Sequence, residues 1–439
     1  SFPRYPKYKE SGVEWLGEVP EGWTVAALAY RYEVALGKML DAKAISGDHL
    51  APYLRNADVQ WGKVRTSELN EMDFDAFDRE RFSLRTGDLL VCEGGEVGRC
   101  AVWRSPIAEC YYQKALHRLR PFRSELDTAE YFQWLMHAAV HGGCFAASES
   151  KATIAHLPAE TFRRHRFAFP PLPEQRAIAA FLDRETGKID ALVAEQERLI
   201  ELLKEKRQAV ISHAVTKGLN PKAPMKDSGI EWLGEVPAHW SCVRNKVVFA
   251  EVDERSESGD EELLTVSHIT GVTRRSDKEV TMFMAETLEG YKRCLAGDLV
   301  INTMWAWMGA LGCSPYDGLV SPAYNVYRAR QAAALSSHYY DYLCRLPSHR
   351  IAMKSRSSGV WESRLRLYPA SFLDMRMCVP PLEEQHAIVA HLDRETSRID
   401  ALLTEAQRAI DLLQERRSAL ISAAVTGQID VRKLGERAA

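Results

Sequence analysis

The sequence lacks the marks of membrane-spanning and secreted proteins. No hydrophobic run approaches the roughly 18 residues that a transmembrane helix needs. The first five residues do not lead into the apolar segment of a signal peptide. The 439 residues include nine cysteines, an odd number, and no Cys-x-x-Cys pair. Without a secretory signal these thiols are expected to stay reduced, so we predict a cytoplasmic protein with no metal site.

An excess of charge of either sign is also absent. Lys and Arg together number 57 and Asp and Glu 60, which gives a formal net charge of -3. A strongly basic balance would indicate a nucleic-acid partner, and its absence neither indicates nor excludes one. Hydrophobic residues make up 46% and charged residues 27%, which is typical of globular proteins. This length predicts about two to four domains.

Catalytic motifs are missing as well. The sequence has no P-loop, no HExxH, no GxSxG and no Asn-Pro-Pro-aromatic tetrapeptide. The glycine-rich segment 93–98 could cradle a phosphate, but a hairpin turn is the favoured interpretation, because the aligned segment 303–308 has no glycine. Dispersed histidines such as His117 and His213 align with Tyr327 and Ala423. We therefore predict that the chain has no catalytic activity.

The most informative feature is an internal duplication. Residues 11–20 (SGVEWLGEVP) return as residues 228–237 (SGIEWLGEVP), 217 positions later. A second match begins at Pro170 and returns at Pro380, and 30 of the 47 positions in 170–216 are identical to those 210 residues on. Between these matches the halves diverge on a common frame: Gly87-Asp88-Leu89 aligns with residues 297–299, and Arg118 and Arg120 align with Arg328 and Arg330. The chain is therefore a tandem of two related units.

Each repeat consists of a variable globular part and a nearly identical helical part. Short apolar runs at 89–92 and 299–301 predict strands, and aromatic-rich segments 130–136 and 339–343 predict helices, so the globular parts are mixed α and β. The predicted domains are 1–169 (repeat start 1–23), 170–220, 221–379 (repeat start 224–240), 380–430 and a tail 431–439. Identical parts should do the same task twice, and divergent parts related but different tasks.

The nearly identical segments carry a heptad pattern. After a short amphipathic stretch at 174–183, apolar residues recur at alternating spacings of three and four, which predicts a helix over 186–213 and its copy over 396–423. Asn220-Pro221 ends the first helix. The expected seam consists of Ile189, Leu192, Gln196, Leu199, Leu203, Lys206 and Val210, and in the copy Ile399, Leu402, Ala406, Ala409, Leu413, Arg416 and Leu420.

One such helix cannot bury its seam alone. Each helix could pack on its own globular part, but nearly identical seams favour packing of the two helices on each other. A pseudo-two-fold relation between the repeats would make the pair antiparallel, whereas a parallel pair would place both globular parts at one end. We predict an α+β fold in which a long antiparallel two-helix coiled coil separates two mixed α/β domains.

With these features the chain resembles the specificity subunit of type I restriction-modification systems. The resemblance rests on Ser-Gly-Val/Ile-Glu-Trp-Leu-Gly at each repeat start, on Pro-Pro-Leu-x-Glu-Gln, and on Leu-Asp-Arg-Glu-Thr followed by Ile-Asp-Ala-Leu. Gly-Asp-Leu and the segment 312–324 also resemble the family. The resemblance covers nearly the whole chain.

The resemblance implies a DNA sequence-recognition subunit without catalytic activity. Each of two target recognition domains would read one half of a bipartite, asymmetric site in double-stranded DNA. The helices would set the spacer and dock two modification (methyltransferase) subunits, and through them the restriction subunits that translocate DNA. No cofactor is expected in this chain; S-adenosylmethionine, ATP and magnesium would belong to the partner subunits.

Base reading requires side chains with fixed donors and acceptors. Neither variable part has a basic excess, since residues 24–169 hold 19 basic and 19 acidic residues and residues 241–379 hold 17 and 16. Each part alone should therefore bind DNA weakly. The DNA-binding candidates are Arg55, Asn56, Gln60, Lys63, Arg65, Arg99, Ser148 and Lys151 in the first part, and His268, Thr270, Arg274, Arg275, Trp305, Tyr324, Arg356, Trp361 and Arg364 in the second.

The helical parts should also carry the partner-binding surface. Its candidates are the charged residues Arg184, Glu185 and Arg207 and their identical copies Arg394, Glu395 and Arg417, because a seam alone would constrain only apolar positions. A helix of about 28 residues is about 42 Å long, or about 12 base pairs of DNA. We therefore expect half-sites of about three to five base pairs, separated by about five to eight. Two alternatives stay open: a coiled-coil scaffold without DNA readout, and a methyltransferase or nuclease with degenerate motifs.

Overall fold

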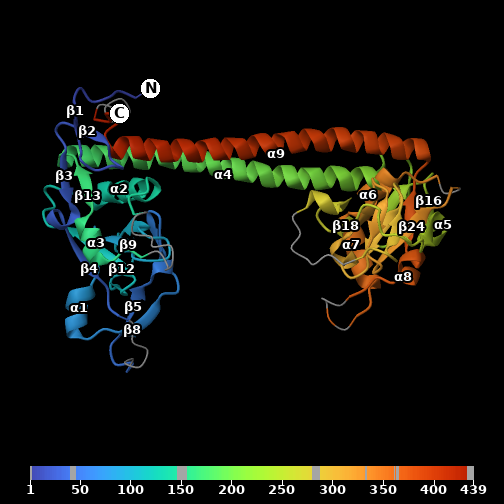
Figure 1. The fold of residues 1–439 in the computed structure, drawn as a ribbon, viewed down its shortest axis with the longest axis horizontal. Coiled ribbons are helices and arrows are strands. Elements are labelled where there is room, and N and C mark those ends of the chain that lie inside the picture. The colour runs from blue at the N-terminus through green and yellow to red at the C-terminus, as the bar shows by residue number, and fades with distance from the viewer. Residues whose placement is uncertain are drawn as a thin grey trace. The chain divides into compact units, whose positions relative to one another are not determined.

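A computed structural model describes residues 2–39, 46–145, 156–278, 287–331, 334–359, 361 and 365–432. The chain divides into two compact units (Figure 1). Unit 1 consists of Ser1–Glu197 and Gln407–Ala439, and unit 2 of Arg198–Ala406. Each unit therefore combines one globular part with stretches of both long helices. Among the described residues, no helix is both long and apolar enough to cross a membrane.

Unit 1 is built on a four-stranded antiparallel sheet with the order β10-β9-β12-β4. A three-stranded sheet, β11-β5-β8, and the pairs β1–β2, β6–β7 and β3–β13 complete its strands. The strands are β1 Tyr8–Glu10, β2 Glu18–Pro20, β3 Thr24–Ala27, β4 Tyr32–Leu36, β5 Leu50–Leu54, β6 Val59–Gln60, β7 Lys63–Val64, β8 Asn70–Asp73, β9 Leu89–Cys92, β10 Cys100–Val102, β11 Tyr111–Tyr112, β12 Leu116–Pro121 and β13 Arg166–Phe169. The helices are α1 Ala76–Phe82, α2 Ala129–His141, α3 Ala159–Arg164 and the start of α4 Leu172–Lys217.

Unit 2 repeats this design with the sheet β22-β21-β24-β17. Its strands are β14 Met225–Asp227, β15 Glu235–Pro237, β16 Ser241–Arg244, β17 Phe249–Val252, β18 Leu264–Ser267, β19 Gly271–Arg274, β20 Lys292–Cys294, β21 Leu299–Asn302, β22 Leu311–Cys313, β23 Gly318–Val320, β24 Tyr324–Ala329 and β25 Arg376–Val379. Its helices are α5 Asn245–Val248, α6 Ser337–Cys344, α7 Pro347–Arg356, α8 Pro369–Asp374 and the start of α9 Leu382–Val425. The mixed α and β composition and the predicted strands and aromatic helices are confirmed.

The two sheets also correct the sequence alignment of the repeats. Arg120 pairs with Asp88 at 2.8 Å, and Arg328 pairs with Asp298 at 2.8 Å, so Arg328 is the counterpart of Arg120. His117 lies opposite Val91, and Asn325 lies opposite Ile301. The counterpart of His117 is therefore Asn325 rather than Tyr327. The second repeat is two residues shorter between the paired strands, which a constant offset cannot reveal.

The long helices begin earlier than the sequence pattern predicts. Helix α4 has 46 residues and α9 has 44, because each extends unbroken to the Pro-Pro-Leu motif. Gly187 lies inside α4 and does not interrupt it. A single helical glycine costs about 1 kcal/mol, which the burial of Ile178, Leu182 and Ile189 in the core of unit 1 exceeds. The expected helix over 186–213 is thus too short.

Several alternate positions of the helix seam are shifted by one residue from the predicted ones. Leu192, Leu199 and Leu402 are 52%, 42% and 48% exposed, so their assignment to the seam is wrong. Their neighbours Val193, Ile200 and Leu403 are turned inward instead. Ile189, Leu203, Ile399 and Leu420 are buried as predicted, and Val210 and Leu413 pack at the edges of the two cores. Adjacent apolar pairs such as Leu192-Val193 fit two heptad frames equally well, and the packing of the first turns on the globular part selects one.

One prediction about the cysteines is also wrong. Cys242 and Cys378 lie opposite each other on β16 and β25 and form a disulfide, whereas reduced thiols were expected throughout. Cys92, Cys100, Cys110, Cys144, Cys294, Cys313 and Cys344 are free. In unit 1 the paired positions on β3 and β13 are Val25 and Ala168, so this cross-link belongs to one repeat only.

Candidate nucleic-acid interface

The repeated Pro-Pro-Leu-x-Glu-Gln motif attaches each long helix to its own globular part. In unit 1 the buried Gln175 amide donates to the carbonyls of Leu126 and Pro170, both at 2.9 Å, and accepts from the Thr128 N–H at 3.0 Å. Glu174 accepts a hydrogen bond from the Trp23 indole at 3.0 Å. These bonds satisfy buried polar groups at the start of the helix.

Unit 2 repeats this attachment with the equivalent side chains. Gln385 donates to the carbonyls of Ala334 at 2.9 Å and Pro380 at 2.8 Å, and it accepts from the Ser336 N–H at 2.8 Å. Glu384 accepts a hydrogen bond from the Trp240 indole at 3.2 Å. The identical segments of the two repeats therefore hold two divergent globular parts in the same way.

The end of each long helix packs on the globular part of the other repeat. In unit 1 the Tyr131 hydroxyl donates to the carbonyls of Ala168 and Val425 at 2.9 and 3.3 Å. In unit 2 the Tyr339 hydroxyl donates to the Val215 carbonyl at 3.0 Å. Residues near the last turn of α9 thus belong to the core of unit 1, and those near the last turn of α4 belong to the core of unit 2.

The loop after the second sheet strand occupies the same place in both units. In unit 1 the Leu157 N–H donates to the Glu93 carbonyl at 2.7 Å, and in unit 2 the Leu367 N–H donates to the Thr303 carbonyl at 3.1 Å. In unit 1 the loop 93–99 joins β9 to β10, which confirms the hairpin prediction for the glycine-rich segment. We call the loop 93–99 and the side chains around it loop cluster 1, and the loop 303–310 and the side chains around it loop cluster 2.

Loop cluster 1 brings together six of the residues predicted to contact DNA. They are Arg55, Asn56, Gln60, Lys63, Arg65 and Arg99, which lie on or beside η2 (Asn56–Asp58), the β6–β7 hairpin and the loop 93–99. The Arg99 guanidinium donates to the Asn56 carbonyl at 2.9 Å, and the Asn56 amide donates to the Gly94 carbonyl at 2.9 Å. Ser148 and Lys151 lie outside the described residues.

Several members of loop cluster 1 are already engaged within the protein. Arg55 forms an ion pair with Asp58 at 3.0 Å, which raises the pKa of the Arg55 guanidinium. Arg99 is also paired with Glu96 at 3.0 Å. Lys63 and Arg65 are exposed. Arg55 and Arg99 therefore shape the loops in this structure, while Lys63 and Arg65 present their charges to solvent.

Loop cluster 2 presents exposed aromatic side chains. Trp305 is 46% exposed, and its ring stacks on that of Trp307 with centroids 6.2 Å apart. The Lys354 ammonium lies over the Trp307 ring at 5.6 Å, and Arg366 approaches Met304. Trp307 was missed among the predicted residues, although the Trp-Ala-Trp spacing around the turn was a visible signal.

The other predicted residues of unit 2 fall into two groups. His268, Thr270, Arg274 and Arg275 lie at the β18–β19 hairpin and just after it. Thr270 accepts a hydrogen bond from Lys278 at 2.7 Å, and Arg274 pairs with Glu262 at 3.3 Å.

The second group consists of Tyr324, Arg356, Trp361 and Arg364. Burial raises the pKa of Tyr324, and the nearby charge of Arg275 opposes that shift. Tyr324 therefore lies close to the β18–β19 hairpin. Arg356 pairs instead with Asp374 at 3.8 Å. Trp361 is 68% exposed, and Arg364 lies outside the described residues.

Two of the predicted partner-binding residues form ion pairs between the long helices. Arg417 pairs with Asp190 at 2.8 Å within unit 1, and Arg207 pairs with Asp400 at 3.3 Å within unit 2. Both are ion pairs between α4 and α9, so helix packing accounts for the identity of Arg207 and Arg417 in the two repeats.

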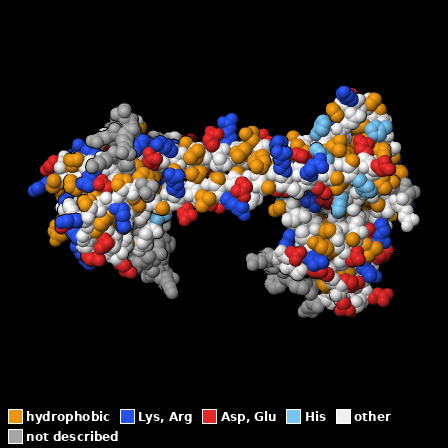
Figure 2. Space-filling model, turned by 90° about the horizontal axis from the view of Figure 1, so that it is seen from above, with side chains coloured by type: hydrophobic (Ala, Val, Ile, Leu, Met, Phe, Trp, Pro, Cys, Tyr) orange, Lys and Arg blue, Asp and Glu red, His pale blue; other side chains and the backbone are white. Residues whose placement is uncertain are grey.

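The other four charged residues pair along their own helices. Arg184 bonds to Glu185 at 3.0 Å, and Arg394 lies 3.9 Å from Glu395. The unexpected exposed groups are apolar: Leu192, Leu199, Leu202, Leu402 and Leu412 are at the surface of the helices. Figure 2 shows apolar side chains on these helices among lysines and arginines.

Three buried histidines have lowered pKa values. Burial lowers the pKa of His117 to about 4 and that of His349 to about 4. Burial, together with His141 and Arg417, lowers the pKa of His137 to about 3. Within the described parts of both units, no three His, Cys, Asp or Glu side chains converge as metal ligands would. These histidines are neutral packing groups at neutral pH.

Comparisons with known proteins find specificity subunits of type I restriction enzymes. Residues 20–202 match the family described as type I restriction modification DNA specificity domain. The chain is 23% identical to the type I restriction enzyme EcoKI specificity subunit of Escherichia coli strain K12, over 94% of this chain and 90% of that protein. It is 24% identical to the EcoBI specificity subunit of Escherichia coli, over 86% of this chain and 80% of that protein.

Solved structures share the fold. A chain from a structure of the type I R-M system, described for its complex assembly and conformational transition, superposes with a TM-score of 0.69 and 16% identity, over 93% of this chain and 98% of that one. The HsdS subunit from Thermoanaerobacter tengcongensis superposes with a TM-score of 0.58 and 17% identity, over 94% and 98%. The chain therefore shares the fold of these solved structures, and its residues 20–202 are similar to the type I restriction modification DNA specificity domain.

Proposed function

We propose that this chain is the DNA sequence-recognition subunit of a type I restriction-modification complex, and that each globular part reads one half of a bipartite, asymmetric DNA site. The observation that carries the proposal is the pair of loop clusters. Both loops accept a backbone hydrogen bond at the same place, from the N–H of Leu157 or Leu367, yet they present different side chains. A common backbone framework with different loop side chains fits two domains that recognise different DNA sequences.

The chemistry of the tips suits base recognition. Lys63 and Arg65 in loop cluster 1 are exposed donors next to the β6–β7 hairpin, and such donors pair with guanine O6 and N7. In loop cluster 2, the exposed Trp305 ring stacks on Trp307, the Lys354 ammonium lies over the Trp307 ring, and Arg366 approaches the neighbouring Met304. That surface can contact a thymine methyl group while its cations bind phosphates.

The paired long helices would act as the spacer. The ion pairs Asp190–Arg417 and Arg207–Asp400 have the same sum of residue numbers, as antiparallel helices require. The first turns of each helix are buried in their own globular part through residues such as Ile178 and Ile388, so they add nothing to the spacer. The part of each helix that can act as the spacer therefore remains about 28 residues long, and the expected gap remains about five to eight base pairs.

The exposed leucines support docking of two modification subunits on the same helices. Leu192 and Leu402 are equivalent in the repeat, as are Leu202 and Leu412, and all four are between 48% and 65% exposed. We expect these repeated, exposed apolar positions to form part of an interaction surface. We expect S-adenosylmethionine in the modification subunits, ATP and magnesium in the restriction subunits, and no cofactor in this chain.

Domain exchange combined with methylation mapping tests the proposal. Replacing residues 24–169 with the corresponding part of another specificity subunit should change one half-site and leave the other and the gap unchanged. Lengthening both helices by one turn should widen the gap by about one or two base pairs without changing the bases. An unchanged half-site after the exchange would refute base reading by residues 24–169, and an unchanged gap would show that the helices do not set the spacing of the site.

A further inference from the structure

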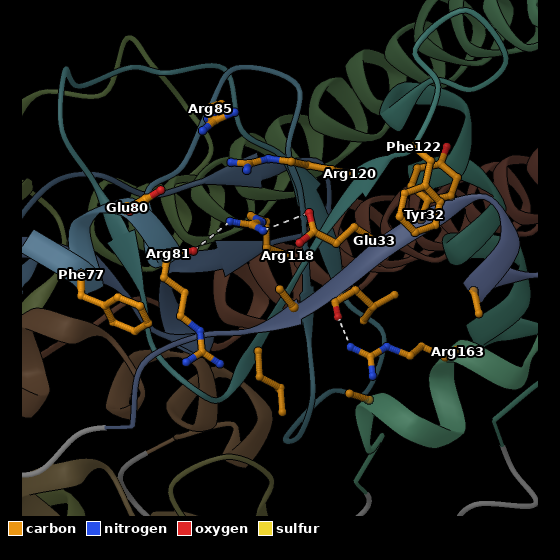
Figure 3. A pocket seen from close by; sticks show the side chains of 15 residues that line it. Tyr32, Glu33, Phe77, Glu80, Arg81, Arg85, Arg118, Arg120, Phe122 and Arg163 are labelled. Atoms are coloured by element: carbon orange, nitrogen blue, oxygen red, sulfur yellow. Dashed lines mark hydrogen bonds and ion pairs between the residues drawn. The ribbon is translucent and has the colours of Figure 1, made fainter.

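An arginine-rich groove lies along the edge strand β4 of unit 1. It has a volume of about 920 Å³, and five arginines and two glutamates line it. The arginines are Arg81, Arg85, Arg118, Arg120 and Arg163, and we call this feature the arginine groove (Figure 3). Strand β4 and strand β10, which borders loop cluster 1, are the opposite edges of the same sheet. The arginine groove is therefore distinct from the proposed base-reading loops.

Three of these arginines are held in place by the protein. Arg120 is paired with Asp88 at 2.8 Å, and Arg163 donates to the Val34 carbonyl. Arg118 is 4% exposed and bonds to Glu33 at 3.2 Å and to the Arg81 carbonyl at 3.1 Å. Its Nε nevertheless has no hydrogen-bond partner within the described residues. A buried, charged donor that lacks a partner costs stability, which favours an anionic ligand in the groove.

The two arginines at the mouth are available to a ligand. Arg81 and Arg85 are exposed, and their guanidinium groups make no hydrogen bond to any described residue. Arg81 projects from α1, as Phe77 does, and Arg85 from the turn that follows this helix (Figure 3). Guanidinium groups bind phosphate oxygens in a bidentate manner.

The described residues of unit 2 do not repeat the arginine cluster, because the cavity of about 300 Å³ at the equivalent place is lined by one arginine, Arg328. Arg85 and Leu295 are equivalent, because each backbone N–H bonds to the aspartate of the Gly-Asp turn, Asp88 or Asp298. Arg118 opposes Leu90 as Val326 opposes Val300, so a valine replaces this arginine. The common framework of the repeats therefore does not require these cations, and a role specific to unit 1 accounts for them.

Two exposed aromatic rings complete the groove. Phe77 and Phe122 both line it and are 67% and 60% exposed. Aromatic rings beside a cationic channel are the elements that bind unpaired bases and their phosphates. We propose that the arginine groove binds nucleotides, with phosphate on Arg81, Arg85 and Arg118 and an unpaired base on Phe77 or Phe122. The nucleotide can be part of a single strand or free, and the proposal does not depend on base reading by the loop clusters.

Fluorescence anisotropy with the full chain and a labelled eight-residue oligothymidine tests the proposal. The double variant R81Q/R85Q should bind about tenfold more weakly, and its salt dependence should fall by about 1.4 in the log–log slope. F77A/F122A should also bind about tenfold more weakly. The control K9Q/R166Q removes two exposed charges of unit 1 outside the groove and should bind like wild type.

Competition then separates the two sources of the nucleotide. Displacement of the oligothymidine by millimolar ATP would show that free nucleotides enter the groove, and failure of ATP with success of unlabelled oligothymidine would assign it to a strand. Wild-type binding that R81Q/R85Q leaves unchanged would overturn the proposal. Displacement by an oligoglutamate peptide but by neither nucleic-acid competitor would overturn it too, since the groove would then take an acidic protein segment. Methylation mapping of R81Q/R85Q should show an unaltered recognition sequence, which keeps this test separate from that of the proposed function.

Discussion

Charge substitutions at the exposed helix leucines separate partner docking from helix pairing. Leu202 and Leu412 occupy equivalent positions in the two repeats and are 53% and 65% exposed. The double variant L202E/L412E should therefore change the free energy of unfolding by no more than about 0.5 kcal/mol. Its effect should appear instead in assembly with the modification subunits.

The expected loss of affinity follows from the surface that docking would cover. Full burial of a leucine contributes about 1.5–3 kcal/mol. Since about half of each side chain is already covered, docking would gain about 1 kcal/mol per leucine, and burial of an unpaired carboxylate would add a penalty of at least that size. Each modification subunit should therefore bind between about 10-fold and 100-fold more weakly.

Analytical ultracentrifugation of the variant with purified modification subunits measures this loss, and thermal unfolding of the variant alone measures its stability. L203A is the matched control, because Leu203 is 7% exposed and lies in the seam. It should lose about 2–3 kcal/mol of stability and keep its affinity for the subunits while folded. If L202E/L412E assembles with two modification subunits at wild-type affinity, the exposed leucines are not the docking surface.

Three further changes test other features of the two units. Burial lowers the pKa of His117 to about 4 from about 6.5 in the unfolded chain, so the stability that depends on neutral His117 is complete above pH 6.5 and is lost as the pH falls toward 4. At pH 5 wild type should have lost about 2 kcal/mol of folding stability through His117, and His117→Asn should not show this loss. Parallel Tm–pH curves for variant and wild type would contradict this prediction. Reduction of the Cys242–Cys378 disulfide, which closes a separation of 136 residues, should cost about 2–4 kcal/mol, and dithiothreitol should lower the Tm of wild type but not of C242V/C378A. K63Q/R65Q should weaken binding of the full chain to its duplex site, with about 1–3 kcal/mol of base discrimination lost for each base contact removed, and unchanged affinity and sequence preference would remove both residues from the interface.

The sequence predicted the architecture best where the repeats are identical. Their near-identity located the Pro-Pro-Leu-x-Glu-Gln motif, whose Gln175 and Gln385 satisfy buried backbone groups in the same way. It could not choose between heptad frames that differ by one residue, since both Leu192 and Val193 are apolar. The frame depends on the contacts that the first helical turns make with the globular part, and periodicity carries no information about those contacts.

The candidate interface was harder to predict, because charge alone does not reveal which side chains are free. Arg55 and Arg99 have the residue type that base reading requires, but both form intramolecular ion pairs. The exposed Lys63 and Arg65 were among the same candidates, and only the fold distinguishes them. Likewise, Arg85 and Arg118 are separated by 33 positions, so the sequence shows no arginine cluster there. The antiparallel pairing of β12 with β4 and β9 brings Arg118 into the groove that Arg85 also lines.

The duplication explains how one chain can combine invariant assembly with variable recognition. Four residues that are identical in the two repeats hold the helix ends. Gln175 and Gln385 fix the start of each long helix, and the Tyr131 and Tyr339 hydroxyls donate to carbonyls in the last turns of the helix from the other repeat. None of these four side chains contributes to the loop clusters. Substitutions at the loops can therefore change what is read without disturbing the helices, whereas loss of Gln175 would leave several buried backbone groups without partners and disrupt unit 1 as a whole.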